Sequence, residues 1–145
     1  MSSSGGDAAK GSEGRADGAR AVVAGHGELA AGLISAVAQI TGRQAALVPL
    51  SNRGLGAPSL EERLRDEVER GARVIFTDLP GGSWTLAARR VMRERPDVVL
   101  VTGVNLAALL DFVMRSDAPA ETAEHAAEKG RSAIAVTGGG AARGH

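Results

Sequence analysis

Residues 21–28 read Ala-Val-Val-Ala-Gly-His-Gly-Glu, an apolar run that ends in a histidine held between two glycines. The run predicts a buried strand, and apolar residues at helical spacing after residue 28 predict a helix. Gly25-His26-Gly27 lies between them and predicts a tight turn. The pattern therefore places one reactive side chain, His26, on a turn at the end of the first strand.

The strand-then-helix pattern repeats along the chain. Apolar runs predict strands at about 20–24, 45–50, 73–77 and 97–102, each followed by a helical pattern, and a further run at 133–136 is a candidate fifth strand. Such alternation is typical of a parallel sheet with helices on both faces and right-handed crossovers. We therefore predict an α/β fold with a single doubly wound sheet of four parallel strands. The alternation leaves the strand order open, and the order that we predict is 2-1-3-4.

Local patterns also predict how the helices begin and end. Ser59 and Glu62 have the spacing of a capping box for the second helix. Ser83 is placed to cap the helix after the third strand, and Gly130 is expected to end the last helix.

Composition narrows the classes of function. In 145 residues, 17 Lys and Arg balance 17 Asp and Glu, and aromatic residues are scarce, so we expect no nucleic-acid partner. Cysteine is absent, which excludes disulfides and thiolate chemistry. No apolar run is long enough to span a bilayer, so direct membrane insertion is not expected.

The chain is expected to form one domain over residues 19–137. Residues 1–18 are rich in Ser, Gly and Ala without the apolar segment of a signal peptide, which predicts a disordered lead-in. Residues 138–145 predict a flexible tail. A cytoplasmic location is the expectation from these features.

Three polar turns follow predicted strands: Gly25-His26-Gly27, Asp78 to Ser83, and Asn105. In doubly wound sheets the ligand site lies beyond the carboxyl ends of the strands, where the strand order reverses. With the order 2-1-3-4 the first and third strands are neighbours, so His26 and Asp78 are expected to face each other.

These residue types suit phosphoryl transfer. Neutral imidazole is nucleophilic near pH 7, and a carboxylate such as Asp78 would fix its tautomer and leave one ring nitrogen free. The turn Gly81-Gly82-Ser83 at a helix start would offer backbone N–H groups and a hydroxyl to phosphoryl oxygens. The glycines beside His26, Gly25 and Gly27, would let a bulky donor protein approach its ring.

Taken together, these motifs resemble a known family. Val-Val-Ala-Gly-His-Gly (22–27), Thr-Asp-Leu-Pro-Gly-Gly-Ser (77–83) and Thr-Gly-Val-Asn-Leu (102–106) look like the enzyme IIA component of the mannose-type bacterial phosphoenolpyruvate-dependent sugar phosphotransferase system, which serves mannose, fructose, sorbose or N-acetylgalactosamine. The resemblance extends over roughly residues 20–136.

The resemblance implies a function and partners. His26 would accept a phosphoryl group from the histidine-containing phosphocarrier protein and pass it to a IIB component, and through it to membrane IIC and IID components. Asp78 would orient His26, and Ser83 would contact the phosphoryl group. The resemblance also implies a homodimer, in which residues 132–136 form an antiparallel strand swapped onto the partner's sheet. No cofactor is implied.

The sequence departs from the family pattern after Ser83. The family commonly continues with Pro and often has Asn two residues later, whereas this chain has Trp84 and Leu86. An exposed Trp84 would be a docking anchor for a partner protein. A Trp84 partly buried under the start of the helix is the other interpretation.

Three other functions are considered. Residues 25–30 match a dinucleotide fingerprint, but the second predicted strand ends without the acidic residue that would bind the ribose, so this function ranks lower. A phosphorylation-dependent regulatory module of the same fold would also need His26 and Asp78. Those two side chains are too few ligands for zinc, and no metal is expected.

Overall fold

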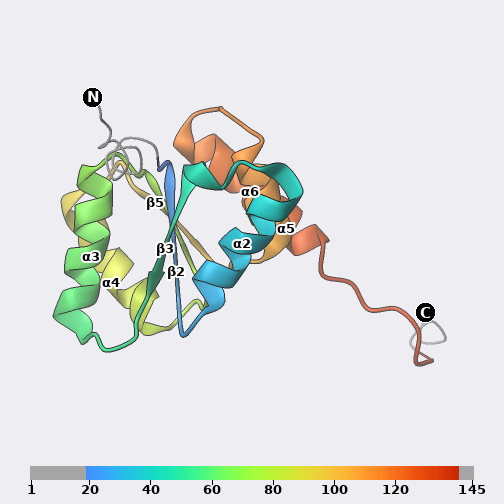
Figure 1. Ribbon diagram of the computed structural model, residues 1–145, viewed down its shortest axis with the longest axis horizontal. Coiled ribbons are helices and arrows are strands. Elements are labelled where there is room, and N and C mark those ends of the chain that lie inside the picture. The colour runs from blue at the N-terminus through green and yellow to red at the C-terminus, as the bar shows by residue number, and fades with distance from the viewer. Residues whose placement is uncertain (1–18, 141–145) are drawn as a thin grey trace.

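The computed structural model describes residues 19–140 and shows a parallel sheet between two layers of helices (Figure 1). The strands are β2 (Ala21–Gly25), β3 (Leu47–Ser51), β4 (Val74–Thr77) and β5 (Val99–Thr102), in the spatial order β3-β2-β4-β5. All three pairings are parallel, so the predicted order is confirmed. The predicted lead-in (1–18) and the last part of the predicted tail (141–145) lie outside the described residues.

Helices cover both faces of the sheet, as Figure 1 shows. One layer consists of α3 (Ala57–Glu69) and α4 (Ser83–Glu94). The other consists of α2 (Leu29–Thr41), α5 (Leu106–Val113) and α6 (Pro119–Ser132), and a short 3₁₀ helix, η1 (Gln44–Ala46), precedes β3. No helix in residues 19–140 is both long enough and apolar enough to cross a membrane.

Strand β2 is the centre of the core, and every one of its residues is buried. Successive side chains of a strand point to opposite faces. Val22 and Ala24 therefore pack in the cluster that includes α3 and α4, while Ala21 and Val23 pack in the cluster that includes α2, α5 and α6. This two-sided burial fixes the direction of β2 and so the position of the His26 turn that follows it.

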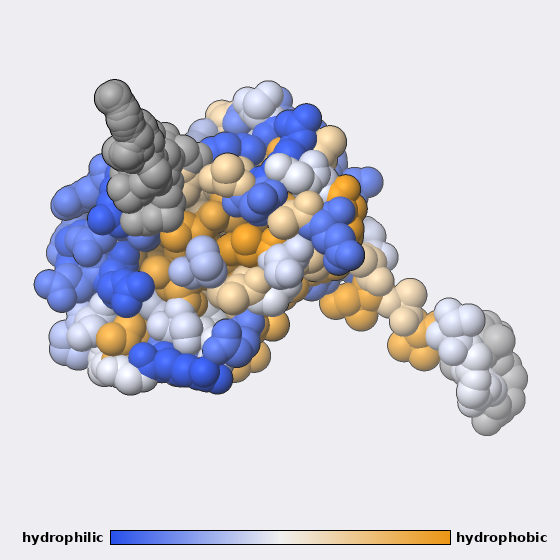
Figure 2. Space-filling view, viewed as in Figure 1, coloured by the Kyte–Doolittle hydropathy of each residue, from blue (hydrophilic) through white to orange (hydrophobic). Residues whose placement is uncertain are grey.

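The two edges of the sheet differ. At the β3 edge Pro49 interrupts the row of backbone donors, a common way of blocking further strand pairing. Figure 2 shows apolar residues between the two helix layers near this edge. The surface over α3 is strongly hydrophilic. At the other edge, β5 carries no proline and all four of its residues are only half-buried.

The predicted capping box at Ser59 is wrong. Helix α3 begins at Ala57, and the carbonyl of Gly56 accepts the N–H groups of Ser59 and Leu60. Proline needs no hydrogen-bond acceptor in a first helical turn, so Pro58 allows the helix to begin earlier than the Ser59 signal suggests.

The end of α6 also differs from the prediction. The helix continues through Gly130 to Ser132, and residues 134–138 then form neither helix nor strand. Ser132 therefore belongs to the helix and not to the predicted fifth strand. The pairing of the following residues with a partner's sheet stays a prediction.

Candidate functional site

The structure brings His26 and Asp78 together at the carboxyl ends of the neighbouring strands β2 and β4. Nδ1 of His26 lies 2.7 Å from Oδ2 of Asp78, and the backbone N–H of His26 donates to the same oxygen at 2.9 Å. The Asp78 side chain is 9% exposed, whereas the His26 side chain is 47% exposed. The protein thus holds the Nδ1 edge of the imidazole, while about half of the side chain's surface stays exposed to solvent.

The charge state of Asp78 follows from its contacts. Burial favours the neutral carboxyl, but the side-chain and backbone hydrogen bonds from His26, together with attraction to its ring, outweigh burial and lower the pKa of Asp78. A carboxylate only accepts hydrogen bonds, so neutral His26 must carry its proton on Nδ1. The Nε2 lone pair is then free. The second oxygen, Oδ1, is buried and has no hydrogen-bond partner within residues 19–140.

The turn after β2 depends on Gly27 and on the loop that follows β3. Gly27 has a φ of +58°. This left-handed conformation is unfavourable for residues other than glycine. Its N–H donates to Oδ1 of Asn52 at 3.3 Å, and Glu28 pairs with Arg53 at 2.8 Å. A Cβ at Gly25 would lie 3.3 Å from Leu29 Cδ2, so a larger residue would crowd this turn.

The N-terminus of α4 lies beside the His26 ring. A Cβ placed on Gly82 would be 3.6 Å from Cε1 of His26, whereas one on Gly81 would meet nothing within 4 Å. The Gly82 carbonyl accepts the Leu86 N–H, so Gly82 is the N-cap, and the predicted capping role of Ser83 is wrong. Ser83 is instead the first helical residue, and it is exposed.

A buried hydroxyl pair holds the segment around Asp78. Thr85 Oγ1 donates to the carbonyl of Leu79 at 2.5 Å and lies 2.6 Å from Oγ1 of Thr77. Because Thr85 has only one hydroxyl proton, Thr77 must be the donor to Thr85. Residues on both sides of Asp78 are therefore tied to the first turn of α4.

Trp84 is fully buried, so it is not the exposed docking anchor that one interpretation of the sequence offered. It packs in the core cluster that includes α3 and α4, and its indole Nε1–H donates to the carbonyl of Gly25 at 3.3 Å. Leu79 and Leu86, which lie near Trp84 in sequence, are instead exposed, at 54% and 52%.

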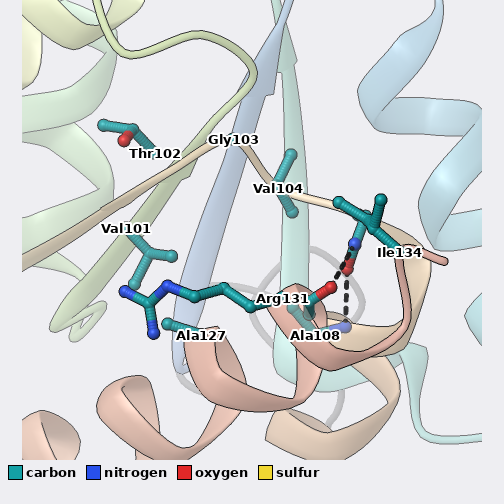
Figure 3. Close-up of a pocket in the computed structure, with 10 residues that line it drawn as sticks. Val101, Thr102, Gly103, Val104, Ala108, Ala127, Arg131 and Ile134 are labelled. Atoms are coloured by element: carbon teal, nitrogen blue, oxygen red, sulfur yellow. Dashed lines mark hydrogen bonds between the residues drawn. The ribbon is translucent and has the colours of Figure 1, made fainter. Parts of the chain in front are cut away.

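Asn105 caps α5 and contacts α6, not His26. Its Oδ1 accepts the N–H of Ala108 at 3.0 Å, and its Nδ2 donates to the carbonyl of Gly130 at 2.9 Å. Figure 3 shows these bonds beside a pocket of about 100 Å³ that Val101, Val104 and Ile134 help to line. Both polar atoms of the side chain are engaged, which supports a structural role.

Gly130 is needed for packing and does not end the helix as predicted. A Cβ at Gly130 would lie 2.9 Å from Asn105 Oδ1 and 3.1 Å from Ala108 Cβ. We expect Gly130→Ala to lower the free energy of unfolding by about 1–3 kcal/mol, because Asn105 or α6 must move and the capping bonds weaken. Urea denaturation followed by circular dichroism measures this change.

Gly32→Ala is the matched control for that variant. Gly32 is exposed within α2, and a Cβ there would meet nothing within 4 Å. Alanine should raise the free energy of unfolding by about 0.5–1 kcal/mol through helix propensity alone. Equal stabilisation by both substitutions would contradict the packing role of Gly130.

Sequence reasoning identified His26, Asp78 and the Gly81-Gly82-Ser83 turn but not the residues that support them. Thr77, Thr85 and Asn52 act through contacts between segments far apart in sequence. No local pattern distinguishes them from other polar residues. The tryptophan at position 84, where the family commonly has proline, marked this position as unusual. The sequence did not show that the Trp84 side chain points into the core.

Comparison with known proteins identifies the family of this chain. Residues 20–129 match the family described as EIIA-man, PTS system fructose IIA component. No curated protein matches the chain.

Solved structures share the fold at low sequence identity. The EIIA component of a phosphotransferase system from Streptococcus agalactiae is 20% identical, with a TM-score of 0.74, over 81% of this chain and 95% of that one. The mannose/sorbose-specific IIA subunit from Enterococcus faecalis is 20% identical, with a TM-score of 0.72, over 83% and 96%. A IIA protein associated with the fucose utilization operon of Streptococcus pneumoniae is 20% identical, with a TM-score of 0.68, over 82% and 93%.

The family match spans the whole sheet, from β2 to β5, and continues into α6. It includes the His26 turn, Asp78 and the start of α4. This chain therefore belongs to the EIIA-man family of phosphotransferase-system IIA components.

Proposed function

We propose that this protein is a cytoplasmic phosphoryl carrier of a sugar phosphotransferase system. His26 accepts a phosphoryl group from the histidine-containing phosphocarrier protein and passes it to a IIB component, which serves membrane IIC and IID components. The observation that carries the proposal is the His26–Asp78 pair, in which Nδ1 is bound to the carboxylate while the His26 side chain is 47% exposed. Membership of the family supports the choice of partners.

The chemistry is a transfer between two nitrogen nucleophiles. The Nε2 lone pair of His26 forms a bond to phosphorus while the P–N bond on the carrier's histidine breaks, and the electron pair of that bond returns to the carrier. Positive charge develops on the His26 ring, and the Asp78 carboxylate at Nδ1 stabilises it. In the second transfer the P–N bond to His26 breaks in turn, and its electron pair returns to Nε2.

The start of α4 stabilises the negative phosphoryl oxygens. The first N–H groups of a helix have no intrahelical acceptor and carry partial positive charge. Gly82, the N-cap of α4, lies beside the imidazole ring, so the N–H groups at this helix start are near the phosphoryl site, and the exposed Ser83 hydroxyl can donate as well.

The direct test is phosphoryl labelling. The protein is incubated with phosphoenolpyruvate, the general first enzyme of the system and the phosphocarrier, and its intact mass and peptide map are measured. We expect one acid-labile phosphoryl group on the peptide that contains His26. His125 serves as an internal comparison because both of its ring nitrogens contact Asp111 or Arg115. A label on His125, or no label at all, would refute the proposal.

A regulatory module with the same phosphorylated histidine is the second candidate. Reconstitution with cognate IIB and membrane components distinguishes the two. Sugar phosphorylation that requires this protein supports the transport role. Labelling of His26 without any sugar phosphate would assign it to regulation.

The proposed oligomer is a homodimer formed through the β5 edge. That edge is half-buried and open, whereas the β3 edge carries Pro49. The segment after α6 extends from the body of the molecule with apolar residues on it, as Figures 1 and 2 show. Ile134 and Val136 are 76% and 85% exposed, and pairing as an antiparallel strand with a partner's β5 would bury them.

We expect the double variant Ile134→Asp and Val136→Asp to sediment as a monomer at concentrations where the unaltered protein is a dimer. Two charges would have to enter an apolar interface without partners. The conservative pair Ile134→Val and Val136→Ile is the control and should stay dimeric. A dimeric aspartate variant would exclude this segment from the interface.

A further inference from the structure

The peptide group between Gly25 and His26 is held at both of its polar atoms. Its carbonyl oxygen accepts the indole Nε1–H of Trp84 at 3.3 Å. Its N–H donates to Oδ2 of Asp78 at 2.9 Å. A peptide group is planar, so two bonds on opposite sides fix its rotation and thereby the position of the His26 Cα.

The backbone here needs such a restraint. The pairing of β2 with β4 ends at Ala24, opposite Thr77, one residue before this peptide. His26 also lies between two glycines, which restrict the chain less than any other residue. The Trp84 hydrogen bond therefore restrains the backbone at a point where pairing between β2 and β4 has ended and where the neighbouring glycines allow many conformations.

Trp84 also belongs to the element that would bind the phosphoryl group. It is the second residue of α4, directly after the Gly82-Ser83 turn, and its side chain is fully buried in the core. Core packing leaves a buried side chain little freedom to move. The indole N–H of Trp84 is therefore held in one place relative to α4. The helix start and the His26 backbone are thus connected through one rigid ring.

We infer that Trp84 is a positioning residue for phosphoryl transfer. Its indole N–H fixes the position and orientation of the His26 imidazole relative to the N-terminus of α4. As a result, Nε2 and the helix N–H groups can contact the same phosphoryl group. The inference rests on the proposed function and goes beyond it by assigning a role to a buried residue that touches neither phosphoryl group nor partner. Small misplacements of reacting groups cost large factors in rate.

The chain contains one tryptophan, which permits an atom-level test. Growth of a tryptophan auxotroph on β-(3-benzothienyl)alanine replaces the indole N–H by sulfur and keeps the shape of the ring. We expect the rate constant for phosphoryl transfer from the phosphocarrier to fall about tenfold, as expected for the loss of one buried hydrogen bond that orients a reacting group. The concentration of carrier at half-maximal rate should not change, because Trp84 is buried.

Val91→Ala is the control for loss of core packing. Val91 lies in the same buried cluster on α4 and has no bond to the His26 turn. This variant should unfold more easily and yet transfer phosphoryl groups at the unaltered rate. Trp84→Phe, which loses both the N–H and ring volume, should show the slow transfer and the lower stability together.

Hydrogen exchange at the His26 amide gives a readout independent of transfer. Without the Trp84 bond the peptide can rotate, so this amide should exchange several-fold faster in the benzothienyl protein than in the parent. An unchanged exchange rate, or faster exchange with an unchanged transfer rate, would overturn the inference. Failure of the unaltered protein to accept any phosphoryl group would instead refute the proposed function, and the exchange data would still decide whether Trp84 restrains His26.

Discussion

His26→Asn is expected to accept no phosphoryl group while keeping its fold. The side-chain nitrogen of asparagine occupies nearly the same place as Nδ1 of histidine, so it can still donate to Oδ2 of Asp78. Nothing in asparagine replaces Nε2 as a nucleophile. The variant therefore separates the structural bond of His26 from its chemistry. Intact-mass measurement after incubation with the phosphorylated carrier checks the result.

The simpler variant His26→Ala should also lose all labelling, but at a cost in stability. It leaves a carboxylate that is only 9% exposed with the backbone N–H of residue 26 as a donor but without the ring donor, and a buried charge that loses a hydrogen bond is destabilised. His125→Ala is the control and should be labelled like the parent, although it loses its contacts with Asp111 and Arg115. Labelling of either His26 variant would assign the phosphoryl group to another residue.

The sequence was sufficient to predict the frame of the site. The strands β2 and β4 are short, apolar and followed by turn residues, so they could be recognised locally, and the parallel topology then placed His26 beside Asp78. The geometry of neighbouring strand ends requires no detailed knowledge of packing. The alternation of strands and helices predicts a parallel sheet but not its strand order, so the position of His26 beside Asp78 depended on the further prediction of the order 2-1-3-4.

What could not be predicted depends on contacts across the fold. Trp84 is buried because the space between α3, α4 and the sheet accommodates its ring. No local sequence pattern indicates the size of that space. Gly130 looks like a helix stop, yet it permits close contact with Asn105. The capping role fell to Gly82 and not to Ser83 because the carbonyl of Gly82 makes the first bond of α4.

Asp78→Asn is expected to slow phosphoryl transfer to His26 by roughly 10²- to 10⁴-fold, the upper value being the loss seen when the histidine-orienting carboxylate of a catalytic triad becomes an amide. If the amide NH₂ faces the ring, it donates to Nδ1 and moves the imidazole proton to Nε2, which blocks attack. If the amide oxygen faces the ring, the tautomer survives but the charge that stabilises the developing imidazolium is lost. Rapid-quench measurement of labelling gives the rate. Asp97→Asn, a carboxylate that pairs with Arg73 and Arg95 before β5, should leave it unchanged.

The same variant should change the pH dependence of stability. The pKa of Asp78 is lowered in the folded protein, so between its folded and unfolded pKa values the unfolded state binds more protons and stability rises with pH. The carboxylate's contribution is complete above its ordinary pKa of 3.8 and is lost as the pH falls through the lower folded value. The difference in unfolding free energy between the parent and Asp78→Asn should therefore shrink as the pH falls below 3.8. A difference that grows below pH 3.8 would mean that the bond to His26 does not stabilise the charged form.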